Sequence, residues 1–319
     1  MAGKLTFKLE QYQEAATIYR EDLLKLPIIG CKSTIQYMTE RPGVRLKEVV
    51  GELVGDAQFA PHKSGRSVNF DLELKHRVLK TEFGSVVAKF DPTSAISTLL
   101  GKGATTGDGL MQTPTALEVL ALIAKKLSKH LNDAIWSGKY NPDGTTTADL
   151  FDGFDTITEQ EIAAGEISQA NKNLLVLDEE ITAANAVDVA KKILRSMSPE
   201  LREEECYLYC DQEFVDFYNE GYMLTHGGLV YNQAYSQQAV EGSNGKLIFC
   251  PLANKAGSKF LHVSLKENML VGYDQMGDEE DVTVEKHEAF ILDYIATMFF
   301  GVQFESIDPR RLLVVQKAA

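Results

Sequence analysis

Cysteine, tryptophan and proline are scarce in this chain of 319 residues, which has four Cys, one Trp and nine Pro. So few thiols do not fit a disulfide-stapled secreted scaffold, and we expect Cys31, Cys206, Cys210 and Cys250 to be small buried side chains in a reduced compartment. Cys206 and Cys210 face the same side of an expected strand, but no second close Cys or His pair completes a zinc site. The sequence therefore predicts no metal.

Long apolar runs are also missing. Residues 1–8 lack the apolar centre of a signal peptide, and the longest run near the middle of the chain, Val119 to Ala124, is too short to cross a bilayer. We therefore expect a protein made in the cytoplasm, without a membrane segment. With 44% hydrophobic and 24% charged residues, the chain has an ordinary globular balance and can bury a substantial core in one or two domains.

No catalytic or cofactor motif is complete. The glycine-rich segment 99–111 misses the dinucleotide-binding spacing by one residue, and no Gly-Lys-Ser/Thr follows a phosphate loop. His226-Gly227-Gly228 resembles an oxyanion turn, but no Gly-x-Ser-x-Gly nucleophile elbow accompanies it. The histidines form no His-x-x-x-His pair, and no pair of acids stands in an apolar setting that raises one pKa. We therefore expect that the chain is not an enzyme and binds no cofactor. The alternative is a soluble hydrolase whose catalytic residues come together only in three dimensions.

Acidic charge exceeds basic charge, and the excess is uneven. Residues 1–140 contain 19 Lys and Arg against 15 Asp and Glu, whereas residues 141–319 contain 13 against 31, so a net charge of +4 is followed by one of −18. The total of −14 argues against tight nucleic-acid binding, which depends on lysine and arginine at phosphates. In an assembly, this asymmetry favours head-to-tail contact between the first half of one subunit and the second half of the next.

The first elements of the chain are an amphipathic helix and a hairpin. Helical spacing runs through residues 9–26, and Pro27 is expected to end that helix. Segments 44–54 and 68–75 are expected to pair around the loop 55–65, which gives a hairpin with one apolar and one charged face. The apolar face needs a cover, and both the core of the same chain and another subunit remain open.

The strongest helix is expected at residues 113–137. Thr113 fits the N-cap, Pro114 the first helical position and Gly138 the stop, and the helix is about 36 Å long at 1.5 Å per residue. Its apolar positions recur every three or four residues, which is typical of a helix that supports one face of a domain.

Residues 141–261 alternate helices and strands. After a turn-rich segment at 141–165 we expect a helix from a Thr182 cap to Pro199, a strand at 206–210, a helix capped by Asp211, an exposed loop at 225–245 and a buried strand at 247–252.

The last fifth, His262 to Val315, reads as a closing sheet interrupted by an acidic turn. Period-2 strands are expected at 262–265, 268–273, 282–285 and 301–304, with a more apolar run at 290–300. The acids at 278–281 are expected to form a solvated turn, because calcium loops need carboxylates at alternating positions and a central glycine.

This order of elements resembles the major capsid proteins of tailed bacteriophages (Caudoviricetes), which have the α+β Hong Kong 97-like fold. The most specific pieces are Lys266 to Asp274, and Phe300 to Phe304 leading to Leu312 to Val315, which are similar to those of phages infecting gut Bacteroidetes. The resemblance covers essentially the whole chain. It implies an N-terminal arm at 1–40, an extended-loop hairpin at 41–85, a peripheral domain at 86–140 and 262–319 with the spine helix 113–137, and an axial domain at 141–261.

The resemblance implies a structural subunit that self-assembles into pentamers and hexamers of an icosahedral head. The head would enclose double-stranded DNA without sequence-specific binding, after assembly in the host cytoplasm, and would be found in the virion. Portal and head accessory proteins are implied, and because the arm begins almost at Met1 we expect a separate scaffolding protein or none. An encapsulin-type nanocompartment shell protein is the alternative on the same fold.

Charged residues of the two halves give a hypothesis for the contact between subunits. Cations of the hairpin region in one subunit would meet the acidic turn of the next; these are Lys63, Arg66, Lys75 and Arg77 against Glu279, Glu280 and Asp281. The founding member of the family has a lysine to asparagine cross-link. Lys63 lies in the hairpin loop, but no asparagine partner matches by motif, and we predict no such bond.

Overall fold

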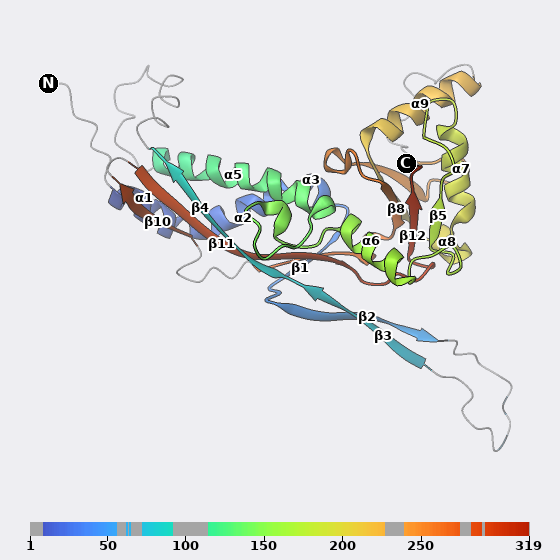
Figure 1. The fold of residues 1–319 in the computed structure, drawn as a ribbon, viewed down its shortest axis with the longest axis horizontal. Helices are drawn as coiled ribbons and strands as arrows, with labels where there is room; N and C mark the ends of the chain where they lie inside the picture. The colour runs from blue at the N-terminus through green and yellow to red at the C-terminus, as the bar shows by residue number, and fades with distance from the viewer. Residues whose placement is uncertain are drawn as a thin grey trace.

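The structure is a computed structural model that describes residues 9–55, 62, 64, 72–91, 114–226, 239–274, 282–288 and 291–318. Within these residues the strands form two five-stranded sheets and a separate two-stranded hairpin, as Figure 1 shows. Helices cover one side of the first sheet and both sides of the second. None of the described helices is both long and apolar enough to span a membrane.

The first sheet is organised around one long strand. β11 pairs with β4 along one edge. Along its other edge it pairs first with β10, at residues 291–296, and further on with β9, at residues 300–304; β1 then pairs with β9 in parallel. The strands are β1 Thr39–Pro42, β4 Glu82–Phe90, β9 Met269–Tyr273, β10 Val282–Glu288 and β11 Ile291–Phe304. The expected strand at 282–285 and the runs 290–300 and 301–304 are thus confirmed, with the last two joined in β11. Strand β4 was not predicted, because its apolar pattern is interrupted by Gly84 and Lys89.

Three helices lie on one face of the first sheet. α1 (Leu9–Ile18), α2 (Arg20–Gly30) and α5 (Pro114–Ser137) enclose a core that contains Tyr12, Leu23, Leu120, Val284 and Tyr294. In Figure 1, α5 runs along the sheet for its whole length. The predicted bounds of α5 are confirmed from Pro114 to Ser137, whereas the expected cap Thr113 lies outside the described residues.

The prediction that Pro27 ends the first helix was wrong. The chain breaks at Tyr19 instead, and α2 continues through Pro27 to Gly30. A proline in a helix removes one backbone hydrogen bond, and burial offsets that cost here because Leu23 and Ile28 are buried in the core clusters. The Cys31 thiol also donates to the Pro27 carbonyl at 3.2 Å. A short helix, α3 (Lys32–Ile35), follows.

The second sheet has the order β5-β12-β8-β6-β7. Its strands are β5 Leu174–Val176, β6 Cys206–Cys210, β7 Leu247–Pro251, β8 Phe260–Ser264 and β12 Leu312–Gln316. Helices α7 (Ala186–Ser196), α8 (Pro199–Glu203) and α9 (Gln212–His226) pack on one face, while α6 (Phe154–Ala164) and the end of α5 pack on the other. Both faces of β8 and β12 are therefore buried, so the expected alternation of apolar and polar residues marks no solvent side.

The expectation of a single closing sheet was wrong. The strands of the last fifth divide between the two sheets, with β9, β10 and β11 in the first and β8 and β12 in the second. A boundary at residue 262 cuts through β8, and β12 pairs with β8 and β5 rather than with the first sheet. Pairing partners decide this division, because a fully apolar strand fits either sheet.

Two other expectations concern the helices of residues 141–261. Asp211 caps α9 as predicted, since its carboxylate accepts the Phe214 N–H at 3.0 Å. The Thr182 cap was wrong, because α7 begins four residues later, and the Asn185 side chain accepts the Thr182 N–H at 2.8 Å. Pro199 does not only end a helix but opens α8, with Ser198 as its N-cap. Of the expected loop 225–245, residues 227–238 lie outside the described residues.

The predicted hairpin is confirmed as an element, but its second strand continues to Lys80, five residues beyond the expected end at 75. β2 (Lys47–Gly55) and β3 (Leu72–Lys80) pair antiparallel over nine positions, from Lys47 opposite Lys80 to Gly55 opposite Leu72. The hairpin extends away from both sheets on the side opposite to α5 (Figure 1). The loop that joins its strands lies mostly outside the described residues, as does the glycine-rich segment 99–111.

Candidate assembly surfaces

The hairpin presents one apolar face to solvent. Val49 and Val78 lie opposite each other in the register and are 69% and 37% exposed. Residues directly opposite in an antiparallel pair share a face, so these two valines form a small apolar patch, with the exposed Lys47 and Lys80 on one side of it and His76 on the other. Near its base the other face packs on the body, where Val50 and Leu79 are buried with Leu270. Exposed valines on a strand pair are a candidate contact surface, because none of the described residues covers them.

The charged face of the hairpin is partly engaged within the subunit. Arg77 donates to Glu161 on α6 and, at 3.2 Å, to the Gln303 side chain on β11. Lys75 is exposed and lies close enough to Asp308 to lower the pKa of that carboxyl, after the larger effect of the Arg310 hydrogen bond. Of the seven residues predicted for the contact between subunits, the structure thus places Arg77 and Lys75. The others, Lys63, Arg66, Glu279, Glu280 and Asp281, lie outside the described residues.

A second apolar surface lies on the side of the first sheet that the helices leave open. It consists of Phe83, Val87, Ile295 and Phe299, and we call it the outward sheet face. Phe83 stands opposite Phe299 with ring centroids 5.1 Å apart, and Val87 stands opposite Ile295. Phe83 and Val87 are each 59% exposed, which is high for large apolar side chains in the middle of a sheet. Sequence reasoning missed this surface because it did not predict β4.

Charged groups bound one end of the outward sheet face. Lys89 of β4 lies opposite Asp293 of β11. His287 of β10 lies between them, with its ring nitrogens 2.7 Å from Lys89 Nζ and 3.0 Å from the Asp293 carboxylate. An apolar centre with a polar margin is the usual composition of a protein interface.

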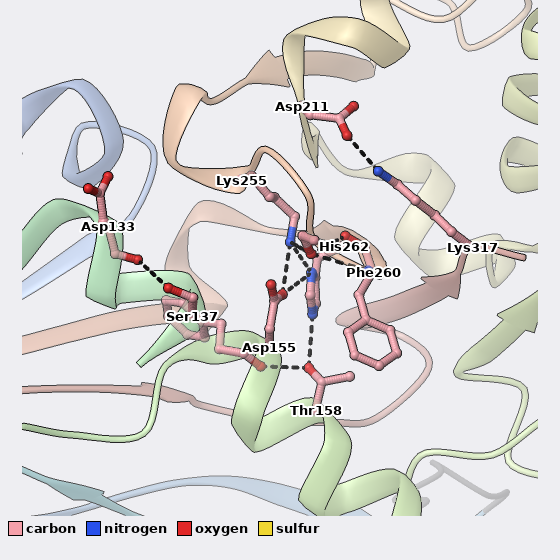
Figure 2. A network of polar contacts seen from close by, with 11 residues as sticks. Asp133, Ser137, Asp155, Thr158, Asp211, Lys255, Phe260, His262 and Lys317 are labelled. Carbon is pink, nitrogen blue, oxygen red and sulfur yellow. Dashed lines mark hydrogen bonds and ion pairs between the residues drawn. The ribbon is translucent and has the colours of Figure 1, made fainter. Parts of the chain in front are cut away.

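A buried polar cluster joins the two halves of the subunit, and we call it the buried joint. It consists of Asp155 and Thr158 on α6, Lys255 after β7 and His262 on β8, which Figure 2 shows, together with Trp136 at the end of α5. The Lys255 side chain is fully buried, and its Nζ lies 3.0 Å from Asp155 Oδ1, 3.1 Å from His262 Nδ1 and 3.9 Å from the centre of the Trp136 ring. The joint therefore ties the second sheet to the two helices that also contact the first.

Hydrogen bonds fix the protonation state of His262. Its Nδ1 accepts from the Lys255 ammonium, so the ring proton lies on Nε2 and donates to Thr158 Oγ, 2.9 Å away. Thr158 in turn donates to the Phe154 carbonyl at 2.8 Å. Burial and the nearby Lys255 cation hold the pKa of His262 well below its usual range. Burial also lowers the pKa of Lys255, and Asp155 opposes that shift.

Stability is expected to fall in mild acid because His262 stays neutral in the folded chain. Below about pH 6.5 an unfolded histidine takes up a proton that folded His262 does not, so the free energy of unfolding falls by up to about 1.4 kcal/mol per pH unit. Urea unfolding of the full chain and of His262→Gln across this range measures the difference. An equal pH dependence in the two proteins would contradict this role of His262.

The four thiols do not form a reactive site. All four cysteines are buried and free. Burial raises the pKa of Cys31 and of Cys206 to about 12, and it raises the pKa of Cys210 and Cys250 further. A thiol with a raised pKa is a poor nucleophile. Among the described residues, no group of three or more Cys, His, Asp or Glu side chains is arranged to hold a metal ion.

Comparison with known proteins places the fold. No family model matches the sequence, and no curated protein matches it. Among solved structures, the satellite phage P4 procapsid that includes the size determination protein matches with a TM-score of 0.58 at 13% identity, over 92% of this chain and 90% of that one. The capsid of the empty GTA particle matches with a TM-score of 0.58 at 15% identity, over 91% and 90%.

An encapsulin shows the same likeness more weakly. The holo-SrpI encapsulin complex from Synechococcus elongatus matches with a TM-score of 0.50 at 8% identity, over 88% of this chain and 85% of that one. These matches run across both sheets and the helices between them, so they concern the whole fold rather than one motif. The chain therefore has the α+β Hong Kong 97-like capsid fold that its sequence resemblance implied.

Proposed function

We propose that this chain is a major capsid protein, a shell subunit that forms the pentamers and hexamers of an icosahedral phage head around double-stranded DNA. The observation that carries this proposal is a capsid fold matched over about nine tenths of both chains. Two uncovered apolar surfaces, on the hairpin and on the outward sheet face, support it. The proposed role is structural: the subunits hold the shell together by the free energy of their contacts with one another.

In the assembly we place the hairpin of one subunit on the outward sheet face of its neighbour. Val49 and Val78 on the hairpin would cover Phe83 and Val87, so that both apolar surfaces leave water together. Burial of one such side chain is worth roughly 1.5 to 3 kcal/mol, and a closed shell repeats the contact in every subunit. Many modest contacts of one kind suit a symmetric assembly.

The remaining features of the proposal follow the capsid resemblance. We assign the N-terminal arm to residues 1–40, the extended loop to 41–85 and the spine helix to α5. We assign the first sheet to the peripheral part and the second sheet to the axial part, so that β8 and β12, which pair within the second sheet, go with the axial part. Assembly in the host cytoplasm, with scaffolding, portal and accessory proteins, and a final location in the virion complete the proposal.

Charge contacts between subunits give a separate prediction. Because Arg77 already pairs with Glu161, we expect Lys63 and Arg66 to contribute most to the contact with Glu279, Glu280 and Asp281 of the neighbour. Charge reversal in Lys63→Glu/Arg66→Glu is expected to lower particle yield and to make particles dissociate at lower salt, because like charges then meet across the contact. Sedimentation of particles across a salt series measures this.

The matched control restores the complementarity. Reversal of the three acids in the same chain, with Glu279→Lys, Glu280→Lys and Asp281→Lys, is expected to recover particle yield when combined with the first pair. An unchanged yield and salt dependence in Lys63→Glu/Arg66→Glu would rule out this pairing. The shell itself would stand, since its main contacts are apolar.

The second candidate function is the shell of an encapsulin-type compartment, favoured by the match to the SrpI encapsulin. The two functions differ in content. Purified particles that contain nuclease-resistant DNA support the phage head, whereas particles that co-purify with one cargo protein and no DNA support the compartment.

A further inference from the structure

The solvent side of α5 is basic, although the protein is acidic. Lys125, Lys126, Lys129 and His130 fall within six consecutive residues and are all exposed. At 3.6 residues per turn they occupy one arc of the helix, and the opposite arc is buried against the core. Among the α5 residues whose side chains the structure describes (119–137), the acid on the same arc is Asp133, which is half-buried.

A close approach of α2 to α5 brings the start of α3, which carries a fourth exposed lysine, beside α5. A Cβ on Gly30 would lie 2.2 Å from Ser128 Oγ, so only glycine lets the end of α2 approach α5 this closely. The Cys31 sulfur, whose hydrogen lies nearer the Pro27 carbonyl, is also 3.4 Å from the Ser128 carbonyl oxygen. Lys32 and Lys129 follow these contact residues directly, and Lys32 is exposed. We call Lys32, Lys125, Lys126 and Lys129 the α5 lysine strip.

The charge of the α5 lysine strip is not balanced by ion pairs within the described part of the chain. None of its four lysines forms an ion pair with another described residue. Lysines on another exposed helix, α7, behave differently: Lys191 pairs with Glu241 at 2.8 Å and Lys192 with Asp178 at 3.5 Å. Four unpaired positive charges close together attract a polyanion, and they do so despite a net charge of −14.

The position of the strip indicates which side of the subunit it serves. α5 covers the helical side of the first sheet, and the outward sheet face lies on the other side (Figure 1). In the proposed shell a neighbouring hairpin covers the outward sheet face. The helical side is then the side left open to the contents of the particle.

We propose that the α5 lysine strip binds the phosphate backbone of the enclosed double-stranded DNA, without reading its sequence. This assignment rests on the proposed function, which supplies DNA as the contents. Each phosphate contact releases condensed counterions, so binding to one subunit is weak and steeply salt-dependent. Many copies on the inner wall of a shell add up to a multivalent attraction.

The test is binding of the purified full chain to a short fluorescent duplex of arbitrary sequence, followed by anisotropy over a range of sodium chloride concentrations. Lys125→Gln/Lys126→Gln/Lys129→Gln is expected to bind at least about tenfold more weakly at low salt. Its slope of log affinity against log salt is expected to be smaller by about 2.7, since each lost phosphate contact contributes about 0.9. Glutamine has a helix propensity close to that of lysine, so α5 is preserved.

The matched control removes three cations from α7, with Lys191→Gln/Lys192→Gln/Arg195→Gln. It changes the net charge equally and is expected to leave the slope unchanged. An equal loss in both variants, or no loss in the α5 variant, would overturn the proposal. Preferential binding of polyglutamate over the duplex would overturn it too, in favour of an acidic protein partner. Particle formation is scored separately by electron microscopy. If the chain forms particles but does not bind the duplex, DNA binding by the α5 lysine strip is contradicted and the proposed shell function is not.

Discussion

Phe83→Asp/Val87→Asp is expected to abolish particle formation while the subunit stays folded. Both side chains are 59% exposed in the described subunit, so their replacement removes little buried area from the fold. In the proposed shell the same two positions lie under the hairpin of a neighbour. Two carboxylates at these positions lose the apolar contact with the hairpin valines and must leave water when the neighbour binds, which is expected to cost several kcal/mol per subunit. Electron microscopy counts the particles, and circular dichroism with thermal unfolding checks the fold.

Leu122→Asp is the matched control for this variant. Leu122 is 50% exposed, but it lies on the solvent side of α5 rather than on the outward sheet face. The control is expected to form particles at normal yield. Particles from the Phe83/Val87 variant at the yield of the original chain would show that the outward sheet face is not an assembly surface.

Asp155→Ala is expected to lower the free energy of unfolding by about 3 to 5 kcal/mol. Removal of one partner from a buried ion pair leaves the other charge buried without compensation. Lys255 is fully buried, and the remaining polar contacts of its ammonium are the Ser258 hydroxyl at 3.2 Å and His262. The cation–π contact with Trp136 recovers only part of the loss. Urea unfolding of the full chain at neutral pH measures the change.

A double variant separates the ion pair from simple packing. Asp155→Leu/Lys255→Met keeps the site filled and removes both charges, so it is expected to recover at least half of the stability that Asp155→Ala loses. The single variants Asp155→Leu and Lys255→Met are measured in the same way. If their losses in the free energy of unfolding simply add up to that of the double variant, Asp155 and Lys255 are not a coupled buried pair.

The parts of the fold with a local signal could be predicted from the sequence. Pro114 and Gly138 bound α5, and Asp211 caps α9, because capping depends on residues next to the helix end. The hairpin followed from strict alternation in residues 68–75 and from the extended character of residues 44–54. The bounds of α2 could not be read in this way, because packing of Leu23 and Ile28 decides that the helix passes through Pro27.

The candidate surfaces depended on contacts between distant residues. The outward sheet face exists because β4 pairs with β11, more than 200 residues away, and the buried joint brings Asp155 beside Lys255. No local pattern marks either partner. The uneven charge of the chain was visible in the sequence, but the gathering of Lys32 with the lysines of α5 depends on the close approach of Gly30 to Ser128.

The central claim is that this chain builds a closed shell. Electron micrographs of material from cells that express the full chain, alone and with its scaffolding protein, test it most directly. The account predicts uniform closed particles in at least one of the two conditions, with the outward sheet face of each subunit covered by a neighbouring hairpin in the reconstructed density. A folded chain that remains a monomer or small oligomer in both conditions would contradict it.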